Sequence, residues 1–428
     1  MDGWINLLLS LEDNINIYIY ILILSSISYY FFCIRKIFID IFDPLFLILL
    51  GSIFAMSTVI YMYWENLLDK NIYFINYLTT EIAFIIGLRI FALNKEKIFI
   101  NTKREKSDLI ANKMKIRLYY LYIILFFGLN GYFYLKYGIP LLDFESHVLA
   151  GVQNGFVTNL KYIIQPVLLF LWIDRFYKKG IILENLLVGL GIICVFILSG
   201  SKSSFLSLAA SLFFYIMYLN KFNIKNKINV KKIYVYILSI AIIFTLIPLY
   251  ILAKDGNIEQ ILILLINRLV GYGDIFAYFY GSNIGDIIIK NNSFYDLIIE
   301  PTAAVFRLIP RDGIHEAIGF QVLKEIYNTN DLLTGPNGRH NVLGLICFGL
   351  YGAPIYSFII GMIISFYTRW CYKNIIGFNF FTYILYMVNY IPIISMPTDF
   401  TRVIQAIILN CLLNGCLMLS VYFFSKKF

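Results

Sequence analysis

Runs of about 20 consecutive apolar residues recur along this chain and limit what it can fold into. Hydrophobic residues make up 60% of its 428 residues, whereas charged residues make up only 14%. A soluble single domain of this length could not bury so much apolar surface in its core. Because about 20 apolar residues in a helix span the hydrocarbon layer of a bilayer, the sequence predicts an all-α polytopic integral membrane protein.

Hydropathy predicts about eleven transmembrane helices. The basic residues of a cleaved signal peptide do not precede the first apolar run, so we expect that run to be retained. The chain then divides into eight N-terminal transmembrane helices (residues 1–253), a large loop (residues 254–340) and three C-terminal helices (residues 341–428). The expected spans are residues 15–34, 44–62, 72–93, 118–136, 162–178, 181–199, 203–220, 233–253, 341–367, 376–396 and 403–424.

The distribution of lysine and arginine predicts how these helices are oriented. One set of connections holds 22 of the 35 basic residues, and basic loops normally lie on the cytoplasmic side. This rule places the N-terminus outside and the C-terminus in the cytoplasm. The two longest segments on the outer side are then residues 137–161 and 254–340.

The loop over residues 254–340 is long enough to carry structure of its own. Residues 259–270 are apolar enough for a re-entrant or interfacial helix, which Gly271 and Gly273 should end. In residues 313–328, apolar side chains recur about one helical turn apart, which predicts an amphipathic helix lying on the bundle.

The sharpest candidate for chemistry is the segment TGPNGRHNVLGLICFGLYG at residues 334–352. A Gly/Pro turn precedes Arg339 and His340, and Asn341 can cap the next membrane helix. The outward N-terminus of that helix would favour phosphate. Arg339 could add a bidentate contact, and His340 could accept a proton near neutral pH. The alternative is a capped helix end with a snorkelling arginine.

Three further residues of the loop could share an anionic site. Arg307 and Arg311 lie four residues apart, and His315 follows them. Plain surface ion pairs with Asp312 and Glu316 are an equal alternative for any one of them.

Arg268 lies in an almost wholly apolar run. An arginine there is costly unless it faces a partner or an anion. We expect it to contact a ligand, with Asp274 as the structural alternative.

Other candidate residues carry weaker signals. A carboxylate within residues 137–161 could deprotonate a hydroxyl, although a solvated loop charge is the better expectation. A lysine in the turn SGSKSS and an arginine beside Asp399 could each reach the substrate. Two charges inside the third span either pair with other helices or line a polar path. The candidates within residues 137–161 are Asp143 and Glu145, with His147 beside them. The lysine of the turn is Lys202, and the arginine beside Asp399 is Arg402. The two charges inside the third span are Glu81 and Arg89.

Several motifs are absent from the sequence. The outer loops hold no Asp-x-Asp, His-x-x-x-His or Cys-x-x-Cys spacing, and the chain has no P-loop or GxGxxG. All six cysteines fall in or at the ends of predicted spans, so no disulfide framework is expected. We therefore expect no metal, no cofactor and no nucleic-acid partner. The substrate itself would carry the energy for a reaction, as a lipid-linked pyrophosphate does.

Taken together, these features resemble the bacterial O-antigen polymerases, the oligosaccharide repeat-unit polymerases of lipopolysaccharide and capsule assembly. The resemblance rests on many spans with one dominant late outer loop, on YGIPLLDFES after a span, on the LSGSKSSFL hairpin and on GRHNVLGLICFGLYGAPIYSFIIGM entering a span. It covers most of the chain at the level of architecture. The hairpin has Lys202 where the family commonly has an arginine.

This resemblance implies a GT-C-like glycosyltransferase in the bacterial inner membrane, with its active site on the periplasmic face. Such an enzyme moves a growing glycan from undecaprenyl pyrophosphate to the non-reducing end of a new lipid-linked repeat unit, without metal. The resemblance and the residue patterns together assign catalysis to His340, Arg339 and Arg311. They assign binding of pyrophosphate or glycan to Arg268, Arg307, His315, Lys202, Asp143, Glu145 and Arg402.

The expected partners are the lipid-linked oligosaccharide as donor and acceptor, the lipid bilayer and a chain-length regulator protein. O-antigen and capsular polysaccharide both remain open as products. Two alternatives remain. An O-antigen ligase would share nearly every feature and differ in its acceptor. A lipid-linked oligosaccharide flippase would place its cations along a central cavity within the spans.

Overall fold

The computed structural model describes residues 2–35, 37–38, 43–92, 109–140, 142, 155–199, 208, 210–213, 215, 258–306, 308–310, 315–329, 335–374 and 380–427. The regular elements in these ranges are helices, and none is a β-strand. The helices are α1 (Gly3–Asp13), α2 (Ile15–Ser28), α3 (Pro44–Trp64), α4 (Asn71–Ile90), α5 (Leu109–Tyr137), α7 (Gly155–Lys179), α8 (Leu183–Ser199), α11 (Ile258–Val270), α12 (Asp274–Tyr280), α13 (Gly285–Asn291), α14 (Glu300–Val305), α15 (Ile318–Tyr327), α16 (His340–Asn374), α17 (Phe380–Ile394) and α18 (Phe400–Lys427). Shorter helical turns lie at Tyr29–Ile34, Gly271–Gly273 and Tyr295–Ile299.

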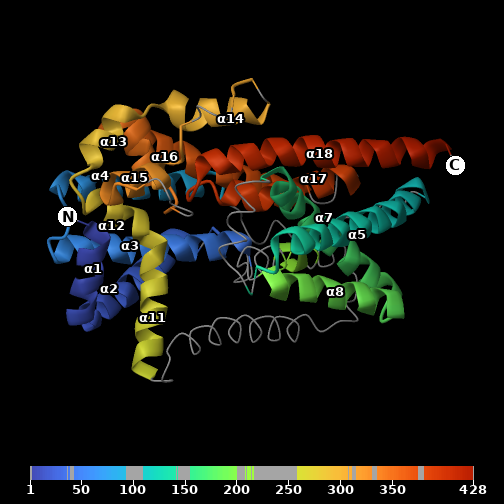
Figure 1. Ribbon diagram of the computed structural model, residues 1–428, viewed down its shortest axis with the longest axis horizontal. Helices are drawn as coiled ribbons and strands as arrows, with labels where there is room; N and C mark the ends of the chain where they lie inside the picture. The colour runs from blue at the N-terminus through green and yellow to red at the C-terminus, as the bar shows by residue number, and fades with distance from the viewer. Residues whose placement is uncertain are drawn as a thin grey trace.

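Most of the long helices lie roughly along one axis, and the two chain termini lie at opposite ends of it (Figure 1). α5, α8 and α18 extend toward the C-terminal end. The short helices α12, α13 and α15 gather at the end that holds the N-terminus, and α11 runs across the common direction (Figure 1). These three short helices of the loop therefore lie over one end of the bundle, whereas α14 lies along its side (Figure 1). Which side of a membrane that end faces stays a prediction.

Several helices are long and apolar enough to cross a membrane. Among the described residues, five meet this requirement singly, and a sixth does if α1 and α2, bent by 100°, count as one broken span. This finding supports a helical, polytopic membrane protein. The five segments are Pro44–Trp64, Asn71–Ile90, Lys113–Tyr137, His340–Tyr372 and Phe400–Phe423.

The predicted number of about eleven spans is matched only in part. α7, α8 and α17 are helices at predicted spans, although α8 has 17 residues and α17 has 15. The predicted span 233–253 and most of 203–220 lie outside the described residues. The count of eleven and the GT-C-like arrangement therefore stay predictions.

α16 is long and apolar enough for the predicted span over residues 341–367, but it is not one continuous helix, because two helices join at a sharp break. Gly349 has φ +67° and ψ −176°, a backbone conformation that favours glycine. His340 lies before this break and Ser357 after it, yet His340 Nδ1 is 2.9 Å from Ser357 Oγ. Seventeen residues of straight helix would extend about 25 Å. The segment before Gly349 therefore folds back along the segment that follows it.

α4 packs against the second part of α16 through two glycines. A Cβ atom added at Gly87 would collide with the carbonyl oxygen of Phe358, and one added at Gly361 would collide with that of Phe84. Small residues at such a crossing let two helix backbones approach closely. This contact fixes α4 beside the folded-back segment of α16.

The loop helices follow the predicted pattern. α11 ends at Val270 and the tight turn Gly271–Gly273 follows it, which confirms the predicted helix end. The amphipathic helix is confirmed over Ile318–Tyr327, with Ile318 and Val322 buried. The predicted start at residue 313 is wrong in part, because residues 315–317 are not helical and the helix begins at Ile318; residues 313–314 lie outside the described residues.

The N-terminus fastens these loop helices to the bundle. Gly3 N donates to Ser282 Oγ at 3.1 Å, and Tyr327 Oη donates to Asp2 Oδ2 at 2.6 Å. Trp4 also stacks on Tyr278 with ring centroids 5.5 Å apart. α1 is therefore part of the cap over this end of the bundle.

Substitution of either crossing glycine tests the close contact between α4 and α16. Gly87→Ala and Gly361→Ala should each lower the free energy of unfolding by about 1–3 kcal/mol, because the added methyl meets backbone that cannot rotate away. Thermal unfolding in detergent measures the effect. Gly415→Ala in α18 is the matched control, since a Cβ there meets nothing within 4 Å. An unchanged Tm in both crossing variants would contradict the packing.

Candidate functional site

Arg339 lies inside the protein, contrary to the expectation that it faces the outer aqueous side. Only 3% of the surface of Arg339 is exposed. Its guanidinium donates to the carbonyl oxygens of Tyr272 at 2.8 Å and Gly51 at 3.3 Å, and to Ser52 Oγ at 2.9 Å. These bonds join α16 to α3 and to the turn after α11. This buried arginine fits neither the expected anion contact nor the alternative of a snorkelling side chain; it links helices inside the protein.

His340 is also fully buried. Its Nδ1 pairs with Ser357 Oγ, its Nε2 lies 3.5 Å from Glu81 Oε2, and its ring packs on Phe84 with centroids 4.7 Å apart. Its backbone N–H donates to the carbonyl oxygen of Pro397 at 2.9 Å. The predicted outward-facing helix N-terminus is therefore wrong. His340 lines neither of the two cavities described below.

Asn341 belongs to the same buried cluster rather than capping the helix. Its Nδ2 donates to Thr80 Oγ1 at 2.8 Å and to Glu81 Oε2 at 3.3 Å. Glu81 also accepts a hydrogen bond from Tyr29 Oη at 2.9 Å. The expectation that Glu81 pairs with other helices is confirmed, whereas Arg89 is exposed in the last turn of α4.

Removing the Arg339 side chain should destabilise the fold. Arg339→Ala leaves two buried carbonyl groups and a hydroxyl without their donor, at a cost on the order of 3 kcal/mol or more. We expect a lower Tm and a smaller monodisperse fraction in gel filtration. Arg268→Ala is the matched control, because that arginine is exposed. A stable, well-folded Arg339→Ala protein without activity would instead return Arg339 to the functional site.

Arg268 and Asp274 do not form the ion pair that was the structural alternative. Arg268 is exposed on α11, and the ion pairs among the described residues do not include it. Asp274 begins α12, where burial raises the pKa of its carboxyl to about 6, against the opposing effect of its hydrogen bond from Ile275 N and of nearby Arg339. Arg268 also lines neither cavity described below.

The buried Asp274 carboxyl makes stability depend on pH. Its pKa of about 6 in the folded protein exceeds its ordinary value of 3.8. The folded state therefore binds the proton more tightly, and stability falls as pH rises between these values. A difference of about two units corresponds to roughly 2–3 kcal/mol.

Asp274→Asn should remove that penalty and raise the Tm at pH 7.5, with little change at pH 4. Asp69→Asn, which removes an exposed carboxylate, is the control. Equal changes of Tm at both pH values would contradict the assignment.

Two adjoining cavities meet at the N-terminus of α18. The first encloses about 330 Å³ between α7, α17 and α18 and is lined mainly by apolar side chains such as Ile163, Ile391 and Leu409. The second encloses about 530 Å³ between the loop and α18, and its wall includes His315, Glu316 and backbone-rich turns. Their linings share four residues, Asn337, Asp399, Arg402 and Gln405. We call these the apolar cavity, the polar cavity and the junction.

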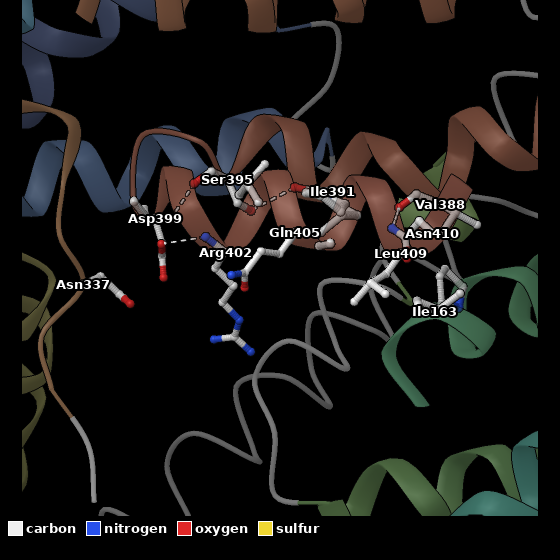
Figure 2. A pocket seen from close by; sticks show the side chains of 15 residues that line it. Ile163, Asn337, Val388, Ile391, Ser395, Asp399, Arg402, Gln405, Leu409 and Asn410 are labelled. Atoms are coloured by element: carbon white, nitrogen blue, oxygen red, sulfur yellow. Dashed lines mark hydrogen bonds between the residues drawn. The ribbon is translucent and has the colours of Figure 1, made fainter. Parts of the chain in front are cut away.

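Arg402 and Asp399 place opposite charges at the junction. Figure 2 shows the Arg402 side chain extending away from α18 into open space. Arg402 is exposed and takes part in none of the ion pairs among the described residues. Its guanidinium is therefore available to an anion.

Asp399 caps the first turn of α18. Its Oδ1 accepts from Arg402 N at 3.1 Å, and no described residue donates to its Oδ2. Desolvation raises the pKa of this carboxyl, partly opposed by that hydrogen bond and by Arg402. A carboxylate with a raised pKa and one unused oxygen can accept a proton from a bound hydroxyl.

His315 lies at the far wall of the polar cavity. Its backbone N–H and its Nδ1 both contact Glu300 Oε2, at 3.2 and 2.8 Å. These hydrogen bonds hold the pKa of the Glu300 carboxyl below its ordinary value. Asp296 offers a third ligand-type oxygen within 4.8 Å of the other two groups. Glu316 pairs with Lys324 at 2.6 Å; the expected pairs with Arg307 and Arg311 involve residues outside the described ranges and stay predictions.

The structure thus brings together two of the predicted site residues and separates others. Arg402 and His315 line one cavity, whereas Arg339 and His340 belong to the buried cluster and Arg268 lies on the surface of α11. The remaining candidates lie outside the described residues, and their roles stay predictions: Asp143, Glu145, His147, Lys202, Arg307 and Arg311.

Asp399, Asn337 and Gln405 line the junction but were not among the predicted site residues. One local signal was available for Asp399, because an aspartate before a long apolar run is a typical N-cap. The place of Asn337 and Gln405 at the junction depends on long-range packing and had no local signal. Comparisons with protein-family models, with curated proteins and with solved structures found no match.

Proposed function

We propose that the protein is a GT-C-like membrane glycosyltransferase that polymerises undecaprenyl-pyrophosphate-linked oligosaccharide repeat units into O-antigen or capsular polysaccharide. The observation that carries the proposal is the junction, where an arginine with no ion pair among the described residues and a half-buried aspartate lie between a cavity with a more apolar lining and one whose wall also holds His315 and Glu316. A lipid-linked glycan has the same order of parts: an apolar tail, a charged pyrophosphate and a polar sugar chain.

Each part of such a substrate has a complementary surface at the junction. The apolar cavity borders α18, which is long and apolar enough to cross a membrane. Arg402 can bind a pyrophosphate oxygen pair with its planar guanidinium. The polar cavity offers amide, carboxylate and backbone groups to sugar hydroxyls through Asn337, Gln405 and the turn at Gly335.

The same two charged residues support the transfer step. A hydroxyl oxygen of the acceptor repeat unit forms a bond to the anomeric carbon of the donor glycan, while the bond from that carbon to the pyrophosphate oxygen breaks. Asp399 takes the hydroxyl proton, and Arg402 stabilises the negative charge that develops on the leaving pyrophosphate. We assign the base role to Asp399 in place of His340, because His340 is enclosed by Ser357, Glu81 and Phe84.

This proposal places the protein in the bacterial inner membrane with the junction facing the periplasm, and a chain-length regulator as its protein partner. An O-antigen ligase would use the same donor site with a lipid A core acceptor. A flippase would need its cations along a path through the spans, whereas Arg402 lies at a helix end. The polymerase is therefore the function that we propose first.

Purified protein incubated with its synthetic undecaprenyl-pyrophosphate repeat unit and EDTA should give a ladder of lengthening glycolipids on a gel. Arg402→Ala should lower the rate at least about 100-fold, since it removes the group that meets the leaving charge. Asp399→Asn should lower it by about 10²–10⁴-fold while preserving the helix cap, because asparagine caps equally well.

Arg268→Ala controls for loss of a positive charge outside the junction. Normal ladders from Arg402→Ala would remove the junction from the active site. Unchanged substrate with the wild-type protein, followed by transfer to a lipid A core acceptor, would identify a ligase instead.

A further inference from the structure

A second cluster of chemically reactive groups lies at the outer wall of the polar cavity. Asp296 lies in the helical turn before α14, Glu300 begins α14, and His315 comes from the segment that leads to α15. One ligand-type atom from each lies within 4.8 Å of the others. The proposed transfer step does not use these three residues.

We propose that Asp296, Glu300 and His315 form a binding site for a divalent transition-metal ion, with Zn²⁺ as the best-fitting ion. One imidazole and two carboxylates are ligands that Zn²⁺ accepts, and a water molecule would complete four-fold coordination. Mg²⁺ and Ca²⁺ prefer oxygen ligands only, so the histidine favours a transition metal. This inference does not depend on the proposed activity.

The distances suit one shared ion. Zn²⁺ binds imidazole nitrogen and carboxylate oxygen at about 2.0–2.2 Å, so neighbouring ligand atoms lie about 3–3.5 Å apart. His315 Nδ1 and Glu300 Oε2 are already 2.8 Å apart. The Asp296 oxygen lies within 4.8 Å of both, so an adjustment of about 1–2 Å would bring it to ligand distance.

The carboxylates are also held in place and left with spare oxygens. Asp296 Oδ2 accepts from Ser293 N at 3.0 Å and from Ser293 Oγ at 2.6 Å, and Oδ1 receives no hydrogen bond from the described residues. Such hydrogen bonds around a ligand orient it for metal binding. Glu300 Oε1 is likewise unused by the described residues.

Charge in the cluster favours a cation. The two carboxylates lie close together, and neither pairs with a lysine or arginine among the described residues. Among the described residues, Glu300 pairs with His315, and Asp296 accepts only from Ser293. A divalent cation would compensate both negative charges at once.

A bound ion would link the two walls of the polar cavity. One wall of the cavity includes Leu297 and Pro301, which directly follow Asp296 and Glu300 in the sequence. Another wall includes Ala317 and Ile318, which come shortly after His315. Coordination would therefore fasten the start of α15 to α14. It would fix the width of the cavity without placing the ion on the proposed leaving group.

Isothermal titration of the purified, EDTA-stripped full-length protein with Zn²⁺, in buffer containing excess Mg²⁺, tests the site. We expect one saturable equivalent, and at least about a tenfold loss of affinity in each of His315→Asn, Asp296→Asn and Glu300→Gln. Glu316→Gln, beside the histidine but paired with Lys324, should bind as the wild type does. Co²⁺ titration should give visible absorption bands that the His315→Asn variant lacks.

These measurements separate the site from the alternatives. Absence of saturable Zn²⁺ binding would show that the cluster is an ion pair only. Binding of equal strength in the wild type and the three variants would place the ion elsewhere in the chain and overturn the proposal. His315 is exposed and its variant should fold, which gel filtration and Tm verify.

Discussion

The hydrogen bonds of one buried guanidinium hold together the elements around which the rest of this structure is arranged. Arg339 donates to Gly51, Ser52 and Tyr272, and so ties α16 to α3 and to the turn after α11. A buried charge without hydrogen bonds is costly; both Nη atoms of Arg339 donate, whereas its buried Nε has no partner among the described residues. The neighbouring Glu81 carries the compensating charge and lies 3.5 Å from His340 Nε2.

This buried cluster also positions the candidate site. The segment before Arg339 lies against the start of α15, where a Cβ at Gly319 would collide with the carbonyl oxygen of Pro336. The backbone N–H of His340 donates a hydrogen bond to the carbonyl oxygen of Pro397, two residues before Asp399. Both segments that form the junction, around Asn337 and Asp399, are therefore anchored by the cluster. A residue can matter for the site through this anchoring without touching a substrate.

Local patterns predicted the helices well, and predicted the functional residues poorly. The apolar windows located α3, α4, α5 and α18, and periodicity located α15, because both depend on short-range composition. The segment around Arg339 matched the chemistry of an anion site, but the same residue types also suit a buried polar cluster. Composition cannot separate the two, since burial of Arg339 depends on α3 and α4, more than 200 residues earlier in the chain.

The sequence by itself determined that this chain is a helical protein with several membrane-length apolar segments, because hydrophobicity over 20 residues is a local property. It also placed the C-terminal end of α11, through Gly271 and Gly273. Only the tertiary structure decided that α16 folds back at Gly349, that Arg339 and His340 are buried, and that Arg402, Asp399 and His315 line one cavity. The physical reason is that burial and convergence depend on which distant backbones approach closely, as they do at Gly87 and Gly361.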